Sequence, residues 1–358
     1  MEIVYGPAEL TRYIAEAASL SPDRPVLVDK YVQGRECEVD AVADGRDVLI
    51  PGLMEHVERA GIHSGDSFAV YPAVTLTQAE KARIISYTIK LARALNVVGL
   101  VNIQYVAAEG EIYVIEVNPR ASRTVPFLSK VTGVPMVRVA TNAILGRSIR
   151  AQGYEPGLVA ESPFWAVKAP VFSFSKLAGV EVSLGPEMKS TGEAMGVAPS
   201  FADALAKAFR AVGVGMLTKG TALVTIADRD KEEALPWIEW LAKAGFRLAA
   251  TAGTALFLIE HGISVEPVNK LGRGTPDVLD LLRSGRVDLV CNTLTRGRVP
   301  ERDGFRIRRA AVEAGIPCLT SLDTLQAYLK ALLGQGGAAN EPLALQDFSS
   351  PRGMEALR

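Results

Sequence analysis

Hydrophobic and polar residues follow two different patterns on either side of residue 200. In the first part, short β-branched runs are separated by glycine and proline, and a clear helical period interrupts them at Ala79–Leu95. Such runs predict an α+β domain with mostly antiparallel strands. The predicted strands include Pro25–Asp29, Val48–Pro51 and Leu100–Tyr105.

In the second part, apolar strand patterns alternate with helical patterns. This alternation predicts an α/β domain with a doubly wound parallel sheet that helices cover on both faces. The predicted strands are Ala222–Ile226, Arg247–Ala250, Ser264–Val268, Asp288–Cys291 and Pro317–Leu319. The predicted helices are Lys231–Ala244, Thr254–Glu260, Pro276–Ser284, Ile307–Ala314 and Leu322–Leu333.

An alanine-rich amphipathic stretch, Phe201–Val212, separates the two patterns and ends at Gly213–Gly215. A helix with a glycine-flanked end is a plausible connection between domains. We therefore expect a first domain over residues 1–200, a linker helix over 201–216, a second domain over 217–335 and a loose tail over 336–358.

The composition narrows the class of protein. The chain has 358 residues, 39 Lys and Arg against 40 Asp and Glu, and 48% hydrophobic residues, which fits a globular protein of two domains. The near-zero net charge argues against a broad nucleic-acid-binding face. No apolar run approaches the roughly 20 residues of a membrane span.

The N-terminal sequence and the spacing of the cysteines are typical of a cytoplasmic protein. Met1–Tyr5 lacks the basic and apolar segments of a signal peptide. Cys37, Cys291 and Cys318 lie far apart without CxxC spacing, so we expect neither a disulfide framework nor a structural zinc site.

A predicted hairpin carries a candidate cation site. Val101–Tyr105 and Ile112–Asn118 are strand-like runs joined by a turn near Gly110, which would place Gln104 opposite Glu116. Opposed residues share a face, and a residue two positions further along shares it too. Gln104, Glu116 and Asn118 would thus offer three oxygen ligands, which suit Mg²⁺.

Two arginines, Arg120 and Arg123, follow the hairpin. Guanidinium groups beside a metal site could stabilise the oxygens of a phosphoryl group in transfer. Spacing alone leaves a second interpretation open, a polar outer face of an ordinary hairpin with surface arginines.

The second domain carries a candidate phosphate site. Thr251 and Thr254 flank Gly253 at the start of a helix, where free backbone N–H groups favour anions. Lys231 begins another helix, for which Asp230 and Glu233 would form a capping box. These residues, with Lys270, Asn292 and Thr293, follow strand ends, where open α/β sheets bind ligands. The alternative is that they are helix caps and loop polar residues, which every such fold contains.

Three stretches, in this order, resemble the large subunit of carbamoyl phosphate synthetase, an ATP-grasp enzyme. They are Met54–His56 with Gly61–Ser67, Glu116–Phe127 (EVNPRASRTVPF) and Gly185–Glu193 (GPEMKSTGE). The likeness extends to about residue 330. It implies an ATP-grasp domain, the second and carbamate-phosphorylating unit of that subunit, followed by a regulatory domain with the methylglyoxal-synthase-like (MGS-like) fold.

The resemblance assigns roles to residues of the first domain. Gln104, Glu116 and Asn118 would hold Mg²⁺ or Mn²⁺ between the phosphates of ATP, and Arg120, Arg123 and Asn118 would act in phosphoryl transfer. Glu36 matches the ribose-binding residue. Lys30 and Val32 match the adenine-contacting strand and hinge, and Gly61, Ile62, His63 and Ser64 match a loop lining the nucleotide site. His63 could also contribute backbone contacts alone.

The resemblance also implies partners. The glycine-rich lid loop and the first ATP-grasp unit of the family would precede Met1, so we expect the missing N-terminal part of the subunit and a glutaminase small subunit as partners. The expected reaction serves pyrimidine and arginine biosynthesis. We expect the chain alone to be inactive or nearly so, which leaves open a second hypothesis, a nucleotide-binding regulatory fragment without catalysis.

For the second domain, the resemblance implies a nucleotide effector, UMP or IMP, on Lys231, Thr251, Thr254, Lys270, Asn292 and Thr293. Methylglyoxal synthases carry a catalytic aspartate where Thr275 stands here, which disfavours a lyase. In ornithine-regulated relatives three acids form the ornithine pocket. Glu58 and Asp66 match two of them, and Ala169 replaces the third, so we expect a weak ornithine response.

Overall fold

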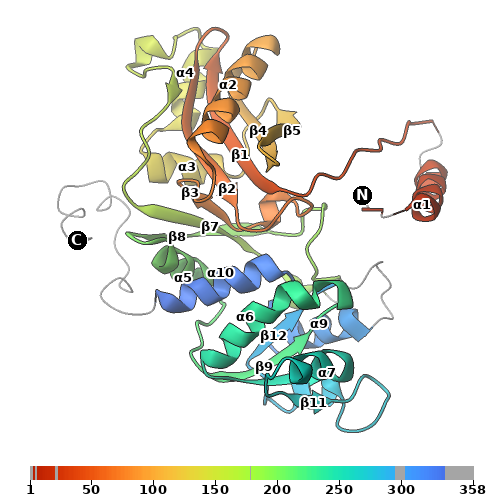
Figure 1. Ribbon diagram of the computed structural model, residues 1–358. Helices are drawn as coiled ribbons and strands as arrows, with labels where there is room; N and C mark the ends of the chain where they lie inside the picture. The colour runs from red at the N-terminus through yellow and green to blue at the C-terminus, as the bar shows by residue number, and fades with distance from the viewer. Residues whose placement is uncertain (1–2, 5, 21–22, 178, 295–302, 335–358) are drawn as a thin grey trace.

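The computed structural model describes residues 3–4, 6–20, 23–177, 179–294 and 303–334, and shows two units that each contain a sheet (Figure 1). The first sheet has eight strands in the order β5-β4-β1-β2-β3-β7-β8, with β6 paired to β2. All these pairs are antiparallel except β2 with β6, which confirms the predicted strand pattern. The strands are β1 (Arg35–Asp44), β2 (Val48–His56), β3 (Ala69–Tyr71), β4 (Val98–Ala108), β5 (Glu111–Asn118), β6 (Gly157–Leu158), β7 (Trp165–Val171) and β8 (Gly192–Ala198).

Helices cover both faces of this sheet. On β1, the apolar side chains of Cys37, Val39 and Ala41 pack in one cluster with α2 (Gln78–Ala94). Val42 has the opposite parity and packs with α3 (Val125–Thr132) and α4 (Met136–Ile144). Successive side chains of a strand point to opposite faces, so the even-numbered residues 36, 38 and 40 point to the α3 side.

The second sheet has five parallel strands in the order β11-β10-β9-β12-β13. Helices pack on both faces, which confirms the predicted doubly wound arrangement. The strands are β9 (Gly220–Thr225), β10 (Phe246–Thr251), β11 (Glu266–Val268), β12 (Leu289–Asn292) and β13 (Cys318–Leu319). The helices are α6 (Lys231–Lys243), α7 (Ala252–Glu260), α8 (Val278–Arg283), α9 (Asp303–Glu313) and α10 (Leu322–Leu333).

Helix α5 (Phe201–Ala211) joins the two units and packs against both. The ring of Phe209 lies 4.6 Å from that of Phe68 in the first unit and 5.6 Å from that of Tyr328 in the second, measured between centroids. On its other side α5 contacts β8 at Gly196, where an added Cβ would lie 2.2 Å from the carbonyl oxygen of Ala204. The predicted linker helix is therefore part of a shared core.

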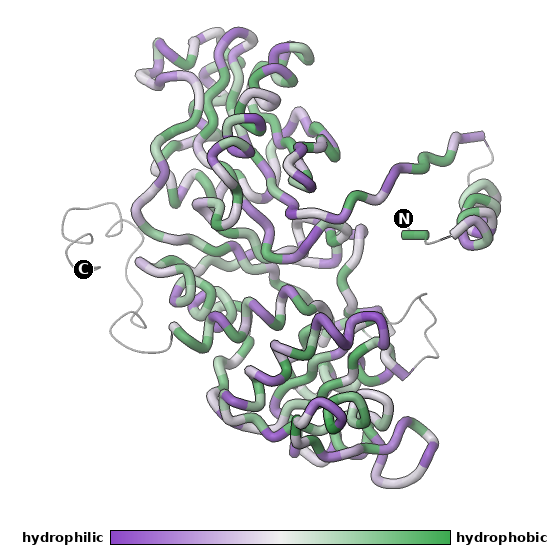
Figure 2. Tube along the Cα trace, viewed as in Figure 1, coloured by the Kyte–Doolittle hydropathy of each residue, from purple (hydrophilic) through white to green (hydrophobic). Residues whose placement is uncertain are grey.

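The N-terminal arm differs from the prediction. Helix α1 (Pro7–Leu20) lies away from both sheets, and an extended segment leads from it to β1 (Figure 1). The prediction of a strand at Pro25–Asp29 is wrong, because this segment forms no ladder among the described residues and a strand needs a paired neighbour. Figure 2 shows its hydrophobic residues apart from both sheets, and the Leu27 side chain is 83% exposed.

The helices that the structure describes do not include one long and apolar enough to cross a bilayer. The predicted loose tail, residues 336–358, lies outside the described residues.

Candidate functional site

The hairpin of β4 and β5 has the predicted register. Gln104 pairs with Glu116 and Asn102 with Asn118, after a turn at Glu109 and Gly110 whose φ angles are both positive. The Asn118 amide donates a hydrogen bond of 2.8 Å to Glu116 Oε1. Gln104 is buried and Glu116 is exposed, so the set spans the border between the core and the solvent.

Strand β1 extends this hairpin into two polar rows that cross three strands. Glu38 pairs with Gln104, which gives the row Glu38, Gln104, Glu116. Asp40 pairs with Asn102, which gives the row Asp40, Asn102, Asn118. Because paired residues share a face, six oxygen-bearing side chains lie together on the α3 side of the sheet.

The β1 end of these rows is a buried ionic cluster. Glu38 is 2% exposed, and its Oε1 lies 3.6 Å from His56 Nε2 and 3.8 Å from the Lys168 ammonium. Glu36 Oε1 lies 3.5 Å from His56 Nδ1. Lys168 also donates a hydrogen bond of 2.9 Å to the carbonyl oxygen of Ser64, so the cluster reaches the predicted nucleotide loop.

Burial and nearby charges shift the pKa values of Glu38 and Asp40 in opposite directions. Burial would raise the pKa of Glu38, but Lys168 and His56 together hold it below its usual value. Burial, reinforced by the charge on Glu38, raises the pKa of Asp40. Divergent pKa values of this kind are typical of functional sites, although structural networks show them too.

The predicted nucleotide loop, Gly61–Ser64, lies against the hairpin. The Gln104 amide donates to Ser64 Oγ at 3.0 Å, which ties the loop to the middle polar row. His63 Nδ1 accepts a hydrogen bond from Gly65 N at 3.0 Å, and the backbone N–H of His63 donates to Gly185 O at 2.8 Å. Burial lowers the pKa of His63, so the ring favours the neutral form that this acceptor role needs.

The residues predicted to bind adenine and ribose do not all lie near the hairpin. Glu36 is buried on β1 beside His56, within the cluster. Val32 packs against Ala60 and the end of β4, near the loop. Lys30 is exposed on the N-terminal arm, and the structure does not bring it to the hairpin.

The two predicted catalytic arginines also behave differently. Arg120 is exposed and donates to the carbonyl oxygen of Ala121 in its own loop. Arg123 is partly buried and donates to Ser190 Oγ at 3.0 Å, and its Nε lies 3.6 Å from Glu193 Oε1. Burial raises the pKa of Glu193, whose Oε1 has no hydrogen-bond partner. Arg123 is thus held beside a carboxyl that our sequence reasoning missed.

The same reasoning missed the buried residues beside Glu36. They are Glu38, Asp40, His56 and Lys168. A signal was present, because Glu36, Glu38 and Asp40 alternate with apolar residues on a strand and therefore place three acids on one face.

In the second unit, the predicted effector residues lie along the carboxyl edge of the parallel sheet. Lys231 Nζ donates to Gly253 O at 2.8 Å, so the lysine lies over the turn between Thr251 and Thr254. Thr251 is the N-cap residue of α7 without a side-chain hydrogen bond, whereas Thr254 Oγ1 accepts from Ile226 N at 3.2 Å. Lys270 is exposed, just past β11.

Asn292 and Thr293 hold the same edge together. The Asn292 amide donates to Thr225 Oγ1 at 2.6 Å, and Thr293 Oγ1 accepts from Ala227 N at 2.8 Å. The predicted capping box of Asp230 and Glu233 is wrong, because Asp230 makes no side-chain cap bond. Glu233 instead forms an ion pair with Arg59 of the first unit.

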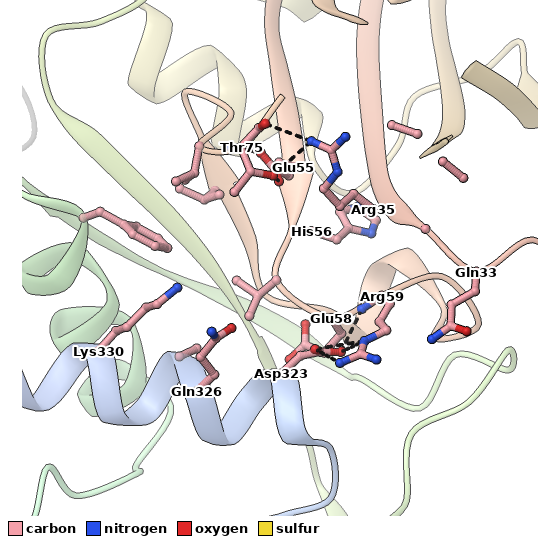
Figure 3. Close-up of a pocket in the computed structure, with 18 of the residues that line it drawn as sticks. Gln33, Arg35, Glu55, His56, Glu58, Arg59, Thr75, Asp323, Gln326 and Lys330 are labelled. Atoms are coloured by element: carbon pink, nitrogen blue, oxygen red, sulfur yellow. Dashed lines mark hydrogen bonds and ion pairs between the residues drawn. The ribbon is translucent and has the colours of Figure 1, made fainter. Parts of the chain in front are cut away.

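Two cavities lie where the units meet. The larger, of about 480 Å³, contains none of the residues predicted to bind ATP or effector. In Figure 3, Arg59 reaches across it from the loop after β2 to Asp323 on α10, and Lys330 points into it. The smaller, of about 260 Å³, is lined by Glu58, Asp66 and several phenylalanines. The case for catalysis therefore rests on the hairpin and not on the larger of these two cavities.

The hairpin can provide a cation with one carboxylate and two amide oxygens, a donor set that suits Mg²⁺ with additional waters or phosphates. Among the described residues, no group of three or more His, Cys, Asp or Glu could hold a metal alone.

Family models match part of each unit. Residues 1–152 match the family model described as carbamoyl-phosphate synthase L chain, ATP binding domain. Residues 233–320 match the model described as an MGS-like domain. The chain therefore has an ATP-grasp-type domain followed by an MGS-like domain.

Similar solved structures are more distant. The biotin carboxylase domain of a single-chain bacterial carboxylase has 18% identity and a TM-score of 0.42, with 59% of each chain covered. The biotin carboxylase domain of Hydrogenobacter thermophilus 2-oxoglutarate carboxylase, in complex with MgADP, ADP and bicarbonate, has 18% identity and a TM-score of 0.46. That match covers 57% of this chain and 51% of the other. The present chain spans less than two thirds of either relative.

Proposed function

We propose that this chain is the C-terminal portion of a carbamoyl phosphate synthetase large subunit. It would phosphorylate carbamate with ATP, giving carbamoyl phosphate and ADP, and a nucleoside monophosphate would regulate it. The observation that carries the proposal is the pair of polar rows across β1, β4 and β5, which bring Gln104, Glu116 and Asn118 to one face. The family model that matches residues 1–152 supports the same reading.

In this reaction a carbamate oxygen attacks the γ-phosphorus and ADP leaves, so the protein mainly positions the reactants and neutralises charge. Mg²⁺ or Mn²⁺, when bound by Gln104, Glu116 and Asn118, would neutralise the phosphate oxygens. Arg123 would stabilise the phosphoryl group in transfer, and Ser190 fixes its guanidinium for that task. Arg120 would turn from Ala121 to the phosphates.

The nucleotide itself would lie against the loop Gly61–Ser64, with Glu36 on the ribose hydroxyls and Lys30 and Val32 beside adenine. The main alternative is a nucleotide-binding regulatory fragment without catalysis. One observation favours it: the Lys30 side chain is exposed on the N-terminal arm, outside any helix or strand.

The second unit would bind UMP or IMP at the carboxyl edge of its sheet. The phosphate would lie on Lys231, Thr251, Thr254 and Lys270, with Asn292 and Thr293 nearby. Asp228 supports this reading, because its carboxylate lies 2.7 Å from Lys231 Nζ, and Lys231 and Lys270 both lower its pKa. A phosphate would replace that exposed carboxylate as the anion between the two lysines.

Calorimetric titration with MgADP tests the catalytic reading. We expect binding to the unmodified chain and a loss of about tenfold in affinity in Glu116→Gln, because the metal loses its one carboxylate. Glu111→Gln is the matched control, since Glu111 is on the same strand and forms an ion pair with the exposed Arg83. Equal MgADP affinity in Glu116→Gln and Glu111→Gln would remove Glu116 from the metal site.

Partners are part of the proposal. The resemblance assigns glutamine hydrolysis to a glutaminase small subunit and the first phosphorylation to the N-terminal part of the large subunit. We therefore propose that the chain alone makes no carbamoyl phosphate from bicarbonate, glutamine and ATP. Synthesis by the purified chain without these partners would contradict this.

A further inference from the structure

A buried arginine on α9 connects the two units. Arg308 is 5% exposed, and its guanidinium forms two parallel hydrogen bonds with Glu181 of the first unit. Its Nε donates to Glu181 Oε1 at 2.8 Å and its Nη2 donates to Oε2 at 2.6 Å. This planar two-point contact fixes the orientation of Arg308 as well as its position.

The third nitrogen of the same guanidinium contacts the proposed effector edge. Arg308 Nη1 donates to Asn292 Oδ1 at 2.6 Å. Asn292 is held on its other side by Thr225 Oγ1, so its amide can adopt only one orientation while both bonds remain. A ligand that draws the Asn292 side chain toward itself must therefore break or stretch the bond to Arg308.

Glu181 begins a segment that leads to the predicted catalytic site. Its carbonyl oxygen accepts from Lys189 Nζ at 3.0 Å, and its Oε1 accepts from Ser183 N at 2.9 Å. The N–H groups of Lys189 and Ser190 both donate to the Asp66 carboxylate. Ser190 in turn accepts from Arg123 through its hydroxyl, at 3.0 Å, and through its carbonyl oxygen, at 3.3 Å.

We propose that Arg308 is the positioning residue through which a nucleoside monophosphate at Asn292 acts on segment 181–190 and so on Arg123. This rests on the proposed effector site. Because Arg308 is buried, its Nη1 must find another acceptor if the bond to Asn292 breaks. Any rotation of the Arg308 guanidinium toward that acceptor also moves the Glu181 carboxylate. The coupling is reciprocal, since a ligand that shifts Arg123 changes affinity at the effector edge by the same factor.

The neighbouring residue provides a matched control. Arg309 is also buried and also joins the two units, through bonds from its Nη1 to the carbonyl oxygens of Phe174 and Leu177. Its Nη2 binds Glu313 on its own helix. No described contact of Arg309 reaches the effector edge, so its loss removes an interface contact without removing the proposed connection.

Hydrogen–deuterium exchange of the full chain, with and without saturating UMP, tests the proposal. We expect UMP to change the exchange rate of residues 181–190 by about fivefold or more, the low end of ordinary allosteric coupling. Glu181→Gln, which keeps the buried arginine, should abolish that response while its affinity for UMP stays within about twofold. Arg309→Ala should keep the response.

Three results would overturn the proposal: no binding of UMP, binding without a change in residues 181–190, or a full response in Glu181→Gln. MgADP titration of the same samples separates this from the catalytic proposal. If UMP alters residues 181–190 and MgADP does not bind, the connection stands and the catalytic proposal falls.

Discussion

The hydroxyl of Thr324 donates a hydrogen bond of 2.8 Å to Glu58 Oε1, across 266 positions of sequence and between the two units. The other carboxylate oxygen of Glu58 accepts from Phe68 N at 2.8 Å. Burial outweighs both bonds and raises the pKa of Glu58 to about 7. The contact between the units therefore contains a carboxyl that titrates near neutral pH.

Glu58 should make stability depend on pH. The pKa of Glu58 in the folded chain, about 7, lies above its ordinary value of 4.5, so between these values the folded state holds a proton that the unfolded state has released. Stability therefore falls as pH rises through this window, by about 3 kcal/mol in total, and the cost remains above it. Urea unfolding at pH 5 and pH 8 should show a larger fall for the unmodified chain than for Glu58→Gln. Equal falls would place the titration elsewhere.

We expect weak or absent binding of ornithine in the 260 Å³ cavity. The resemblance to ornithine-regulated relatives places Ala169 where their third acid stands. The Asp66 carboxylate already accepts hydrogen bonds from Lys189 N and Ser190 N. Losing one charged partner should cost an ammonium ligand about 1.5–3 kcal/mol. Calorimetry should find ornithine no tighter than norvaline, which lacks the side-chain amine. Micromolar ornithine affinity would contradict the inference from Ala169.

Phosphate should dominate effector recognition. Lys270→Ala should weaken UMP binding by about 1.5–3 kcal/mol, roughly tenfold or more, because one ammonium partner of the phosphate is lost. Lys219→Ala is the control, since Lys219 is exposed and precedes β9 at the opposite edge of the sheet. Uridine should bind the unmodified chain poorly. If uridine binds as tightly as UMP, the threonines and lysines of this edge are ordinary caps and surface charges.

Gly196→Ala should strongly destabilise the chain. The new Cβ would lie 2.2 Å from Ala204 O and 2.4 Å from Ala208 N, both backbone atoms of α5 that cannot move independently. Relief requires a shift of the helix, which typically costs about 1–3 kcal/mol or more. Gly192→Ala on the same strand has no neighbour closer than 3.6 Å and should be nearly neutral. Thermal unfolding that places both variants at the same midpoint would show that α5 can move away.

The hairpin could be predicted because its information is local. A glycine turn between two alternating strands predicts the hairpin, and the pairing of Gln104 with Glu116 was predicted from a turn centred near Gly110. In the structure the turn pairs Ala108 with Glu111, and a register shift between Gln104 and Tyr105, which the sequence did not reveal, brings Gln104 opposite Glu116. The βα order of the second unit was predictable for the same reason, since strand and helix periods differ clearly.

The other features of the fold and of the site depend on contacts between distant parts of the chain, which sequence spacing does not encode. Lys168 looks like one polar residue in an apolar strand, and only the sheet order brings it beside Glu38. The residues Pro25–Asp29 have the composition of a strand, yet strand formation needs a partner that the described residues do not offer them. Glu233 fits a capping box by spacing, but Arg59 from the other unit binds it instead.

Helix α5 has a consequence for how the chain can be divided. Phe209 packs against both Phe68 and Tyr328, so a cut after residue 200 or after residue 212 would expose part of one hydrophobic cluster to water. Truncated proteins that separate the two units at the helix should therefore aggregate, whichever side keeps α5. Fusion, circular permutation and exchange of the second unit between relatives should succeed only when α5, β8 and α10 are transferred together.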